Sequence, residues 1–207
     1  MLGVGLHGVS RVKTTENGSR GGLSLTQLAE CAKKYVHTSA IKQKEKPMNL
    51  YDIKTEEEWQ KILDDLRESL SMPTALVDPQ SFVLQESGER HELCKAIRAN
   101  KESLISICAR TQKFMSREAR ETRKPVIVSC EANMSKCLIP VFSDDEFMGS
   151  VVVCGTAIPE EEITPTMIAE SINRSEAEVN RMIEQVPVMD TKEVADVANR
   201  VFGEIHS

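Results

Sequence analysis

After Met48 the hydrophobic residues recur at intervals of three and four, the spacing of one face of an α-helix. Thr55 is followed three residues later by Glu58, and this capping-box pair fits the N-terminus of a helix. The pattern predicts a helix over about 55–71, because Pro73 cannot continue it. Its apolar stripe consists of Trp59, Ile62, Leu63, Leu66 and Leu70.

Short β-branched runs separated by turn signals predict strands. Residues 74–77 and 82–84 flank Asp78-Pro79-Gln80-Ser81, which predicts a hairpin because Asp-Pro favours the start of a turn. Further strands are expected over 126–129, 136–142 and 147–157. Five short strands interrupted by helices indicate an α+β fold with a mainly antiparallel five-stranded sheet, flanking helices and a helical C-terminal extension.

Helical spacing returns at about His91, where Leu93, Cys94 and Ile97 share a face. A second helix is expected from about Asn100 to Thr122. Its predicted inward face holds Leu104, Ile107, Cys108, Met115 and Ala119.

The chain after Pro159 has helical patterns over about 164–172, 175–186 and 190–206. Ser175 and Glu178 form a second capping-box pair. The last helix carries an apolar stripe that suits either the sheet of its own domain or a partner, so a homodimer is among the expected assemblies. The stripe consists of Val194, Val197, Ala198, Val201, Phe202 and Ile205.

These patterns divide the chain into three parts. Residues 1–47 are read as a flexible basic leader with one short helix at about 24–38. Residues 48–160 form the predicted α+β domain, and residues 161–207 its helical extension.

Charge is distributed unevenly. Residues 1–48 carry eight Lys or Arg and three Glu, and subtracting this +5 from the total of −6 leaves −11 for the rest. An acidic body argues against direct binding of nucleic acid, which needs clustered Lys and Arg. No apolar run approaches membrane-spanning length, and Met1 to Gly22 lacks a signal-peptide core, so no membrane contact and a cytoplasmic location are expected.

Cys94, Cys108 and Cys130 lie on three consecutive predicted elements. If they converge they can line one site, since thiol sulfur is soft and, as thiolate, a strong ligand for zinc or iron–sulfur centres. Their spacing matches no compact zinc signature, and buried cysteines also behave simply as small hydrophobic residues. A closed metal site needs a fourth ligand, for which Cys137 is the candidate, whereas Cys154 is expected to pack in the core.

Residues 91–156 resemble the PocR-type sensory domain, a variant of the PAS-like fold. The resemblance rests on the order of the three cysteines, on Lys124-Pro125-Val126-Ile127 and Ile139-Pro140-Val141, and on the glycines at 149 and 155, and it extends over about 50–205. It implies a cytoplasmic, non-enzymatic sensor that binds a small metabolite such as a hydrocarbon derivative.

The chain departs from the family pattern at three positions. Glu131 stands where His is common, Asn133 where Gly is common, and Thr156 where Gln follows the last Gly. We expect the ligand to contact Cys94, Arg98, Cys108, Cys130 and Glu131, with Arg98 suited to an anionic group and Glu131 to a hydroxylated one.

The sensor interpretation implies a signalling or regulatory protein partner, since no kinase or DNA-binding output is visible in the sequence. One alternative is a metal or redox sensor holding zinc or an iron–sulfur cluster on Cys94, Cys108, Cys130 and Cys137. A lesser alternative is a cysteine-dependent enzyme, for which His91 is the only plausible base. No nucleotide-binding or hydrolase motif is present.

Overall fold

The structure is a computed structural model that describes residues 48–159 and 161–207. The predicted leader, with its expected helix over 24–38, lies outside the described residues. The described residues belong to one compact unit. No helix in this part of the chain combines the length and the apolar character needed to cross a membrane.

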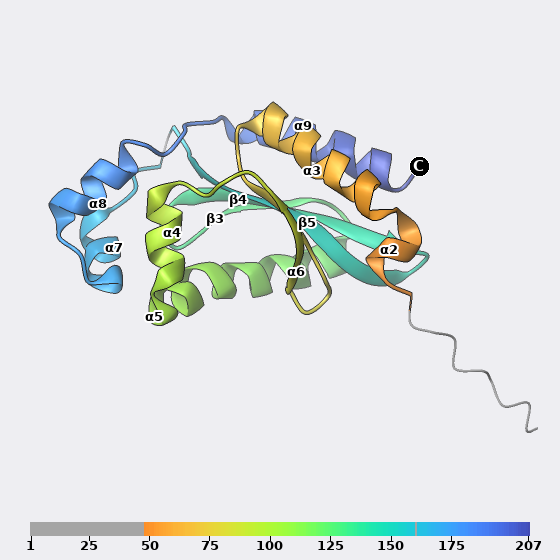
Figure 1. The fold of residues 1–207 in the computed structure, drawn as a ribbon, viewed down its shortest axis with the longest axis horizontal. Coiled ribbons are helices and arrows are strands. Elements are labelled where there is room, and N and C mark those ends of the chain that lie inside the picture. The colour runs from red at the N-terminus through yellow and green to blue at the C-terminus, as the bar shows by residue number, and fades with distance from the viewer. Residues whose placement is uncertain (1–47, 160) are drawn as a thin grey trace, which may run out of the picture. The chain divides into compact units, whose positions relative to one another are not determined.

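A five-stranded sheet forms the centre of this unit (Figure 1). The strand order is β2-β1-β5-β4-β3, and every neighbouring pair is antiparallel. The strands are β1 (Thr74–Val77), β2 (Val83–Ser87), β3 (Val126–Ser129), β4 (Met134–Ser143) and β5 (Glu146–Ala157). The predicted α+β, PAS-like fold is confirmed, including the hairpin of β1 and β2.

Three helices cover one face of the sheet: α2 (Leu50–Ile53), α3 (Glu56–Leu70) and α9 (Thr191–Ile205). The capping box predicted for α3 is present, since Glu58 N donates to Thr55 Oγ1 at 3.2 Å and Thr55 N donates to Glu58 Oε2 at 2.7 Å. Trp59 is fully buried, and its Nε1 donates to Leu50 O at 2.8 Å, which fixes α2 against α3.

The terminal helix α9 packs on this same face. Its residues Val194, Ala198, Val201 and Ile205 are buried together with residues of α3 and the sheet. The apolar stripe is therefore covered by the domain itself, and it no longer supports the expected homodimer.

On the opposite face, α6 (Arg110–Thr122) lies across the sheet. Met115 and Ala119 of this helix pack on Leu138 of β4 and Val152 of β5. Side chains alternate along both strands, so Cys137 and Val153 face α3 and α9, while Leu138 and Val152 face α6.

The helix expected over 100–122 is not uniformly α-helical. It consists of α5 (Lys101–Ser103), a π-helical segment η1 (Leu104–Ala109) and α6. A π turn is wider than an α turn and often marks a functional site. Across η1, Ile107 is buried while Ile105 is 56% exposed.

A third cluster of buried residues closes one end of the sheet. It joins α4 (Glu92–Ala99), η1, α7 (Pro165–Ile172) and α8 (Glu176–Ile183) around Met134 of β4, and Figure 1 shows α7 and α8 beside α4. The predicted helices at 164–172, 175–186 and 190–206 are confirmed, including the capping box of Ser175 and Glu178.

Candidate functional site

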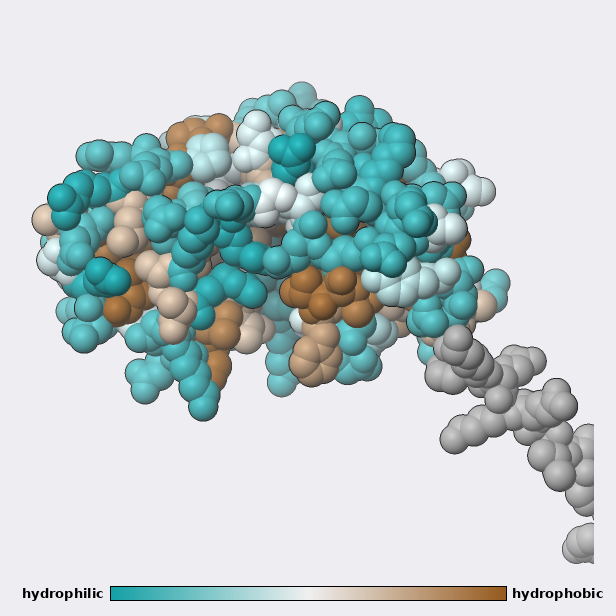
Figure 2. Space-filling view, viewed as in Figure 1, coloured by the Kyte–Doolittle hydropathy of each residue, from teal (hydrophilic) through white to brown (hydrophobic). Residues whose placement is uncertain are grey.

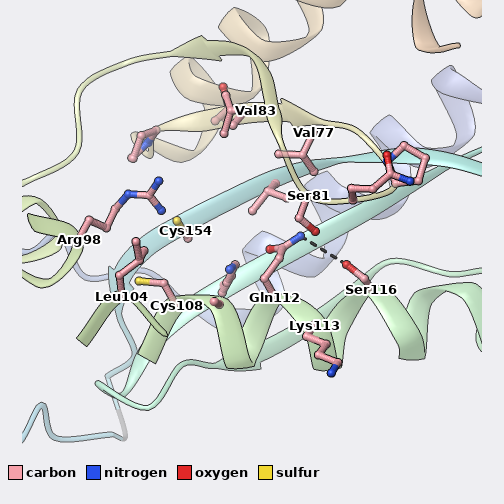
Figure 3. Close-up of a pocket in the computed structure, with 18 of the residues that line it drawn as sticks. Val77, Ser81, Val83, Arg98, Leu104, Cys108, Gln112, Lys113, Ser116 and Cys154 are labelled. Atoms are coloured by element: carbon pink, nitrogen blue, oxygen red, sulfur yellow. Dashed lines mark hydrogen bonds between the residues drawn. The ribbon is translucent and has the colours of Figure 1, made fainter. Parts of the chain in front are cut away.

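A cleft of about 750 Å³ opens between the sheet and the helix formed by η1 and α6. Its walls come from β1, β5 and the β1–β2 connection on one side and from the helix on the other, as Figure 3 shows. The apolar part of the lining includes Ala75, Val77, Val83, Leu104, Ala109 and Val152. This volume is in the range of small-molecule sites in proteins.

A smaller cavity of about 40 Å³ lies next to the cleft, near α4. Its walls carry four thiols, those of Cys94, Cys108, Cys130 and Cys154. The two spaces adjoin, because they share Arg90, Arg98, Cys108, Lys136 and Cys154 as lining residues. The smaller cavity has room for about one water molecule or a methyl-sized group.

Four different elements bring the thiols to this place. Cys94 lies in the first turn of α4, where His91 is the N-cap and its Nδ1 accepts from Cys94 N at 3.4 Å. Cys108 lies in η1, and Cys154 faces the helix from β5, with both sulfur atoms turned into the space between helix and sheet (Figure 3).

Cys130 is held by the turn between β3 and β4. Cys130 N donates to Met134 O and Asn133 N donates to Cys130 O, each at 2.8 Å. Asn133 has φ 52°, a left-handed conformation that Asn tolerates better than most residues. The exchange of the family's common Gly for Asn133 therefore preserves the turn that positions Cys130.

Gly155 lets β5 approach α4 closely at the thiol-lined cavity. Its φ is +112°, and a Cβ atom there would lie 2.9 Å from His91 Nε2 and 3.7 Å from Cys94 Sγ. A side chain at this position would force the His91 ring to move and would be strained at this φ, so glycine is required for the close approach.

Three of these thiols, those of Cys94, Cys108 and Cys130, have raised pKa values and are protonated at neutral pH. Burial raises the pKa of Cys94, and the neighbouring thiols of Cys154, Cys108 and Cys130 raise it further. Burial likewise raises the pKa of Cys108 and of Cys130. Neutral thiols act as a polarisable, weakly polar wall, and they are poor nucleophiles and poor metal ligands.

The charges along the cleft all have one sign. Six cationic residues line it, and none of the described lining residues is Asp or Glu. Two of these cations already have protein partners: Arg90 pairs with Glu86, and Arg120 donates to Pro79 O at 2.8 Å. The side chain of Lys113 points away from the cavity in Figure 3. The six are Arg90, Arg98, Lys113, Arg117, Arg120 and Lys136.

Lys136 differs from the other cations because it is buried, with 8% of its surface exposed. Among the described residues, no carboxylate lies within ion-pair distance of its ammonium group and no side chain or backbone group hydrogen-bonds to it. Arg90 Nε and Ser135 Oγ, both from residues of the small cavity, are also buried without a hydrogen-bond partner. Buried polar groups are normally satisfied, so these atoms are suited to a bound group.

The structure brings together most of the residues expected from the sequence. Cys94, Cys108 and Cys130 line one cavity, and Arg98 lines both this cavity and the cleft. Glu131 is exposed in the β3–β4 turn and lines neither space, so it lies apart from the other expected ligand contacts.

Cys137 does not join the other thiols, and the expected four-thiol metal set is corrected here. The strand alternation turns its side chain into the core under α3 and α9, where burial raises its pKa to about 12. Within the described part of the chain, no three Cys, His, Asp or Glu side chains are grouped to hold a metal ion. The set of four thiols that includes Cys137 is therefore not brought together.

The lining residues that were not expected as ligand contacts include Arg90, Lys136 and Cys154. For Lys136 and Cys154, the alternation of side chains between the two faces of the sheet indicates which face each residue occupies. Lys136 has the parity of Leu138, and Cys154 has the parity of Val152, so each faces α6 as its apolar neighbour does.

Comparison with known families supports the fold and the general role of the domain. The family described as the sensory domain found in PocR matches residues 52–203. The chain belongs to the PocR sensory-domain family. The matched residues include the five strands, the residues that line the cleft, α7, α8 and most of α9. Membership of this family makes the chain a sensory domain.

No curated protein sequence matches this PocR domain. Among solved structures it is similar to a GAF domain/HD domain protein from Geobacter sulfurreducens, with a TM-score of 0.35 and 9% identity over 78% of this chain and 95% of that chain. It is also similar to the C-terminal domain of a protein described as a transcriptional regulator from Vibrio cholerae, with a TM-score of 0.34 and 13% identity over 72% and 98% of the two chains. Similarity at this level does not transfer a function.

Proposed function

We propose that this PocR domain is a non-enzymatic sensor whose small-molecule ligand binds in the cleft between the sheet and the η1–α6 helix. The observation that carries the proposal is the cleft itself, a space of about 750 Å³ that narrows into a cavity lined by four thiols. Its walls combine aliphatic side chains with a few convergent polar groups, as ligand sites generally do.

The protonation of the thiols favours a sensor over the alternatives that use thiolate chemistry. Burial raises the pKa of Cys94, Cys108 and Cys130, so a reactive or metal-binding thiolate is disfavoured at neutral pH. In the proposed role these residues shape the inner end of the site and contact the ligand by dispersion.

The route from the cleft to a protein partner runs through η1. Leu104 and Cys108 of η1 line the cleft, and Ser103, immediately before η1, bonds through its Oγ to Ser171 O of α7 at 2.7 Å. A ligand that displaces η1 therefore also displaces α7. We propose that a signalling partner reads this movement at the α7–α8 end of the domain.

The test is whether filling the cleft abolishes ligand binding. Ala109 lines the cleft from the end of η1, and Ala109→Phe adds bulk there without disturbing the buried core. Ser106→Phe adds the same bulk to the same segment at an exposed position that lines neither space. Metabolites of a mixed library are scored by the rise in melting temperature, because a ligand of the native state stabilises it.

We expect metabolites that stabilise the wild type to stabilise Ser106→Phe equally and Ala109→Phe much less. At a concentration about 100 times the Kd, the ligand adds about 2.7 kcal/mol to the free energy of unfolding, so its loss is readily measured. Equal stabilisation of both variants would place the ligand elsewhere and contradict the proposal.

A further inference from the structure

The charged residues that line the cleft indicate the charge of the ligand, which the volume of the cleft alone does not. The described part of the chain belongs to an acidic protein, with −11 on the residues after Met48. Yet the residues that line the cleft include six cations and, among those described, no carboxylate. An excess of positive charge in one concave region of an acidic surface attracts anions and raises their local concentration.

Lys136 supplies an observation independent of that excess. It projects from β4 into the place where the cleft and the small cavity meet, is 92% buried, and has no counter-charge among the described residues. Its ammonium group makes no hydrogen bond or ion pair with a described residue, so its donors are free to bind a negatively charged group that enters the adjoining space.

Two further cations lie at the same junction. Arg98 lines both spaces and makes no ion pair or hydrogen bond with any described residue. Arg90 also lines both, and although it pairs with Glu86, its Nε is buried and unbonded. Guanidinium groups present planar donors that match carboxylate and phosphate oxygens.

We infer that the ligand of this site is a small organic anion, with its carboxylate or phosphate group held by Lys136, Arg98 and Arg90. The carbon skeleton lies outward along the aliphatic wall formed by Ala75, Val77, Leu104 and Val152. The inference rests on the proposed function, that the cleft is the sensory site. The small cavity is too narrow for the skeleton, which therefore extends into the cleft.

The experiment compares anions with neutral molecules of the same skeleton. Straight-chain carboxylates and alkyl phosphates of roughly two to eight carbons are each paired with the corresponding primary alcohol. Binding to the full chain is measured by calorimetry and by thermal shift. The carboxylate and phosphate series distinguish the two sources of negative charge, and we expect at least one series to bind while its alcohols do not.

Charge-removing variants test which residues hold the acid group. Lys136→Met keeps the approximate length of the side chain and removes its charge, and Arg98→Gln removes the charge at an exposed position with a shorter polar side chain. The matched controls are Lys101→Met and Arg110→Gln, which are exposed and line neither space. We expect each site variant to bind the anion at least about tenfold more weakly, the loss typical of one charge-assisted contact, and each control to bind as the wild type does.

Stability without ligand separates loss of binding from loss of folding. Because Lys136 makes no ion pair or hydrogen bond with a described residue, Lys136→Met loses no such contact, and its melting temperature in the absence of ligand should equal or exceed that of the wild type. Arg98→Gln, which changes an exposed residue, gives the same binding test if Lys136→Met does not fold.

Two results would overturn the inference. One is equal binding of alcohols and anions, and the other is the absence of binding by every anion in both series. If alcohols bind and Ala109→Phe abolishes their binding, the anion inference fails while the proposed function stands. If compounds bind but Ala109→Phe has no effect, the proposed function itself fails.

Discussion

The two faces of the sheet are built to different rules. Under α3 and α9 the packing is apolar and closed, with Trp59, Leu63, Val153 and Val194 fully buried. Under η1 and α6 the packing is interrupted by a cleft that contains a buried lysine and hydrogen-bonding atoms without partners. The first face is closed by apolar packing, whereas the second keeps polar groups that have no protein partner and that a bound molecule can satisfy.

Cysteine shows the difference most clearly, because the same residue type lies on both faces of neighbouring strands. Cys137 is 1% exposed and packs among aliphatic side chains, while Cys154 is half-buried and lines both the cleft and the small cavity. What a thiol contributes is decided by the face it occupies. Comparison of matched substitutions on the two faces therefore tests whether stability and binding are divided in this way.

The largest effect is expected at Trp59. Trp59→Ala removes a fully buried side chain and its hydrogen bond to Leu50 O, so we expect the free energy of unfolding to fall by about 3–5 kcal/mol. Chemical denaturation followed by circular dichroism measures this, because the variant lacks the single tryptophan. Tyr51→Ala, at a 41% exposed position of α2, should cost less than about 1 kcal/mol. Equal costs at both positions would contradict a closed core on this face.

A matched pair of cysteine substitutions sharpens the comparison. Cys137→Ser places a hydroxyl among apolar groups without a hydrogen-bond partner and should cost about 1–3 kcal/mol. Cys154→Ser places the same hydroxyl beside the cleft, where water reaches it, and should cost less than about 1 kcal/mol. Urea unfolding of the two variants gives the comparison, and the reverse order would show that the faces are not distinguished in this way.

Thiol labelling tests the protonation of the cavity. Since burial raises the pKa of Cys94, Cys108 and Cys130, these thiols should react with a disulfide reagent more slowly than free cysteine at about pH 7. The rate should continue to rise above the ordinary thiol pKa of roughly 8.5. A Cys31→Ser background removes the thiol outside the described residues. One fast-reacting cavity thiol near neutral pH would revive the cysteine-enzyme alternative.

The smallest effect is expected in the pH dependence of stability at His91. Burial lowers the pKa of His91, so the folded state binds its proton less readily than the unfolded state does. The stability from neutral His91 is present above the unfolded pKa of roughly 6.5 and is lost as the pH falls through the lowered folded value. His91→Asn retains a side chain suited to the N-cap of α4. As the pH is lowered through this range, the free energy of unfolding should fall less steeply for the variant than for the wild type. Equal pH dependence in the two proteins would show that His91 does not contribute.

Much of the fold could be predicted from the sequence because its signals are local. The helix predicted over 55–71 is observed as α3, Glu56–Leu70, with the predicted capping box, and the strand predicted over 74–77 is β1. These elements are fixed by neighbouring residues: a cap, a proline or an alternating run. The extent of β2 was less well predicted: the expected strand covers 82–84, whereas β2 is Val83–Ser87, and its last three residues are polar and carry no apolar signal.

The site was only partly predictable because it depends on long-range geometry. The convergence of Cys94, Cys108 and Cys130 was an expectation from their order, and the structure brings them to one cavity. The π turn that places Cys108 has no signature in the hydrophobic period, so a single helix over 100–122 was expected instead. The burial of Lys136 has no local signal in the sequence, because a lysine at the start of a strand is usually exposed and its burial depends on α6 lying above it.

The widened turn at Leu104–Ala109 has a mechanical consequence. A π turn contains one residue more than an α turn, so conversion of this segment to α-helix would shift one residue into the neighbouring segment. Each residue of an α-helix corresponds to a rotation of about 100° and a rise of about 1.5 Å, so α5 would rotate and translate by about these amounts relative to α6. A molecule wedged against Leu104 and Cys108 would hold the turn open, and its departure would be transmitted as torsion rather than as the swing of a hinge.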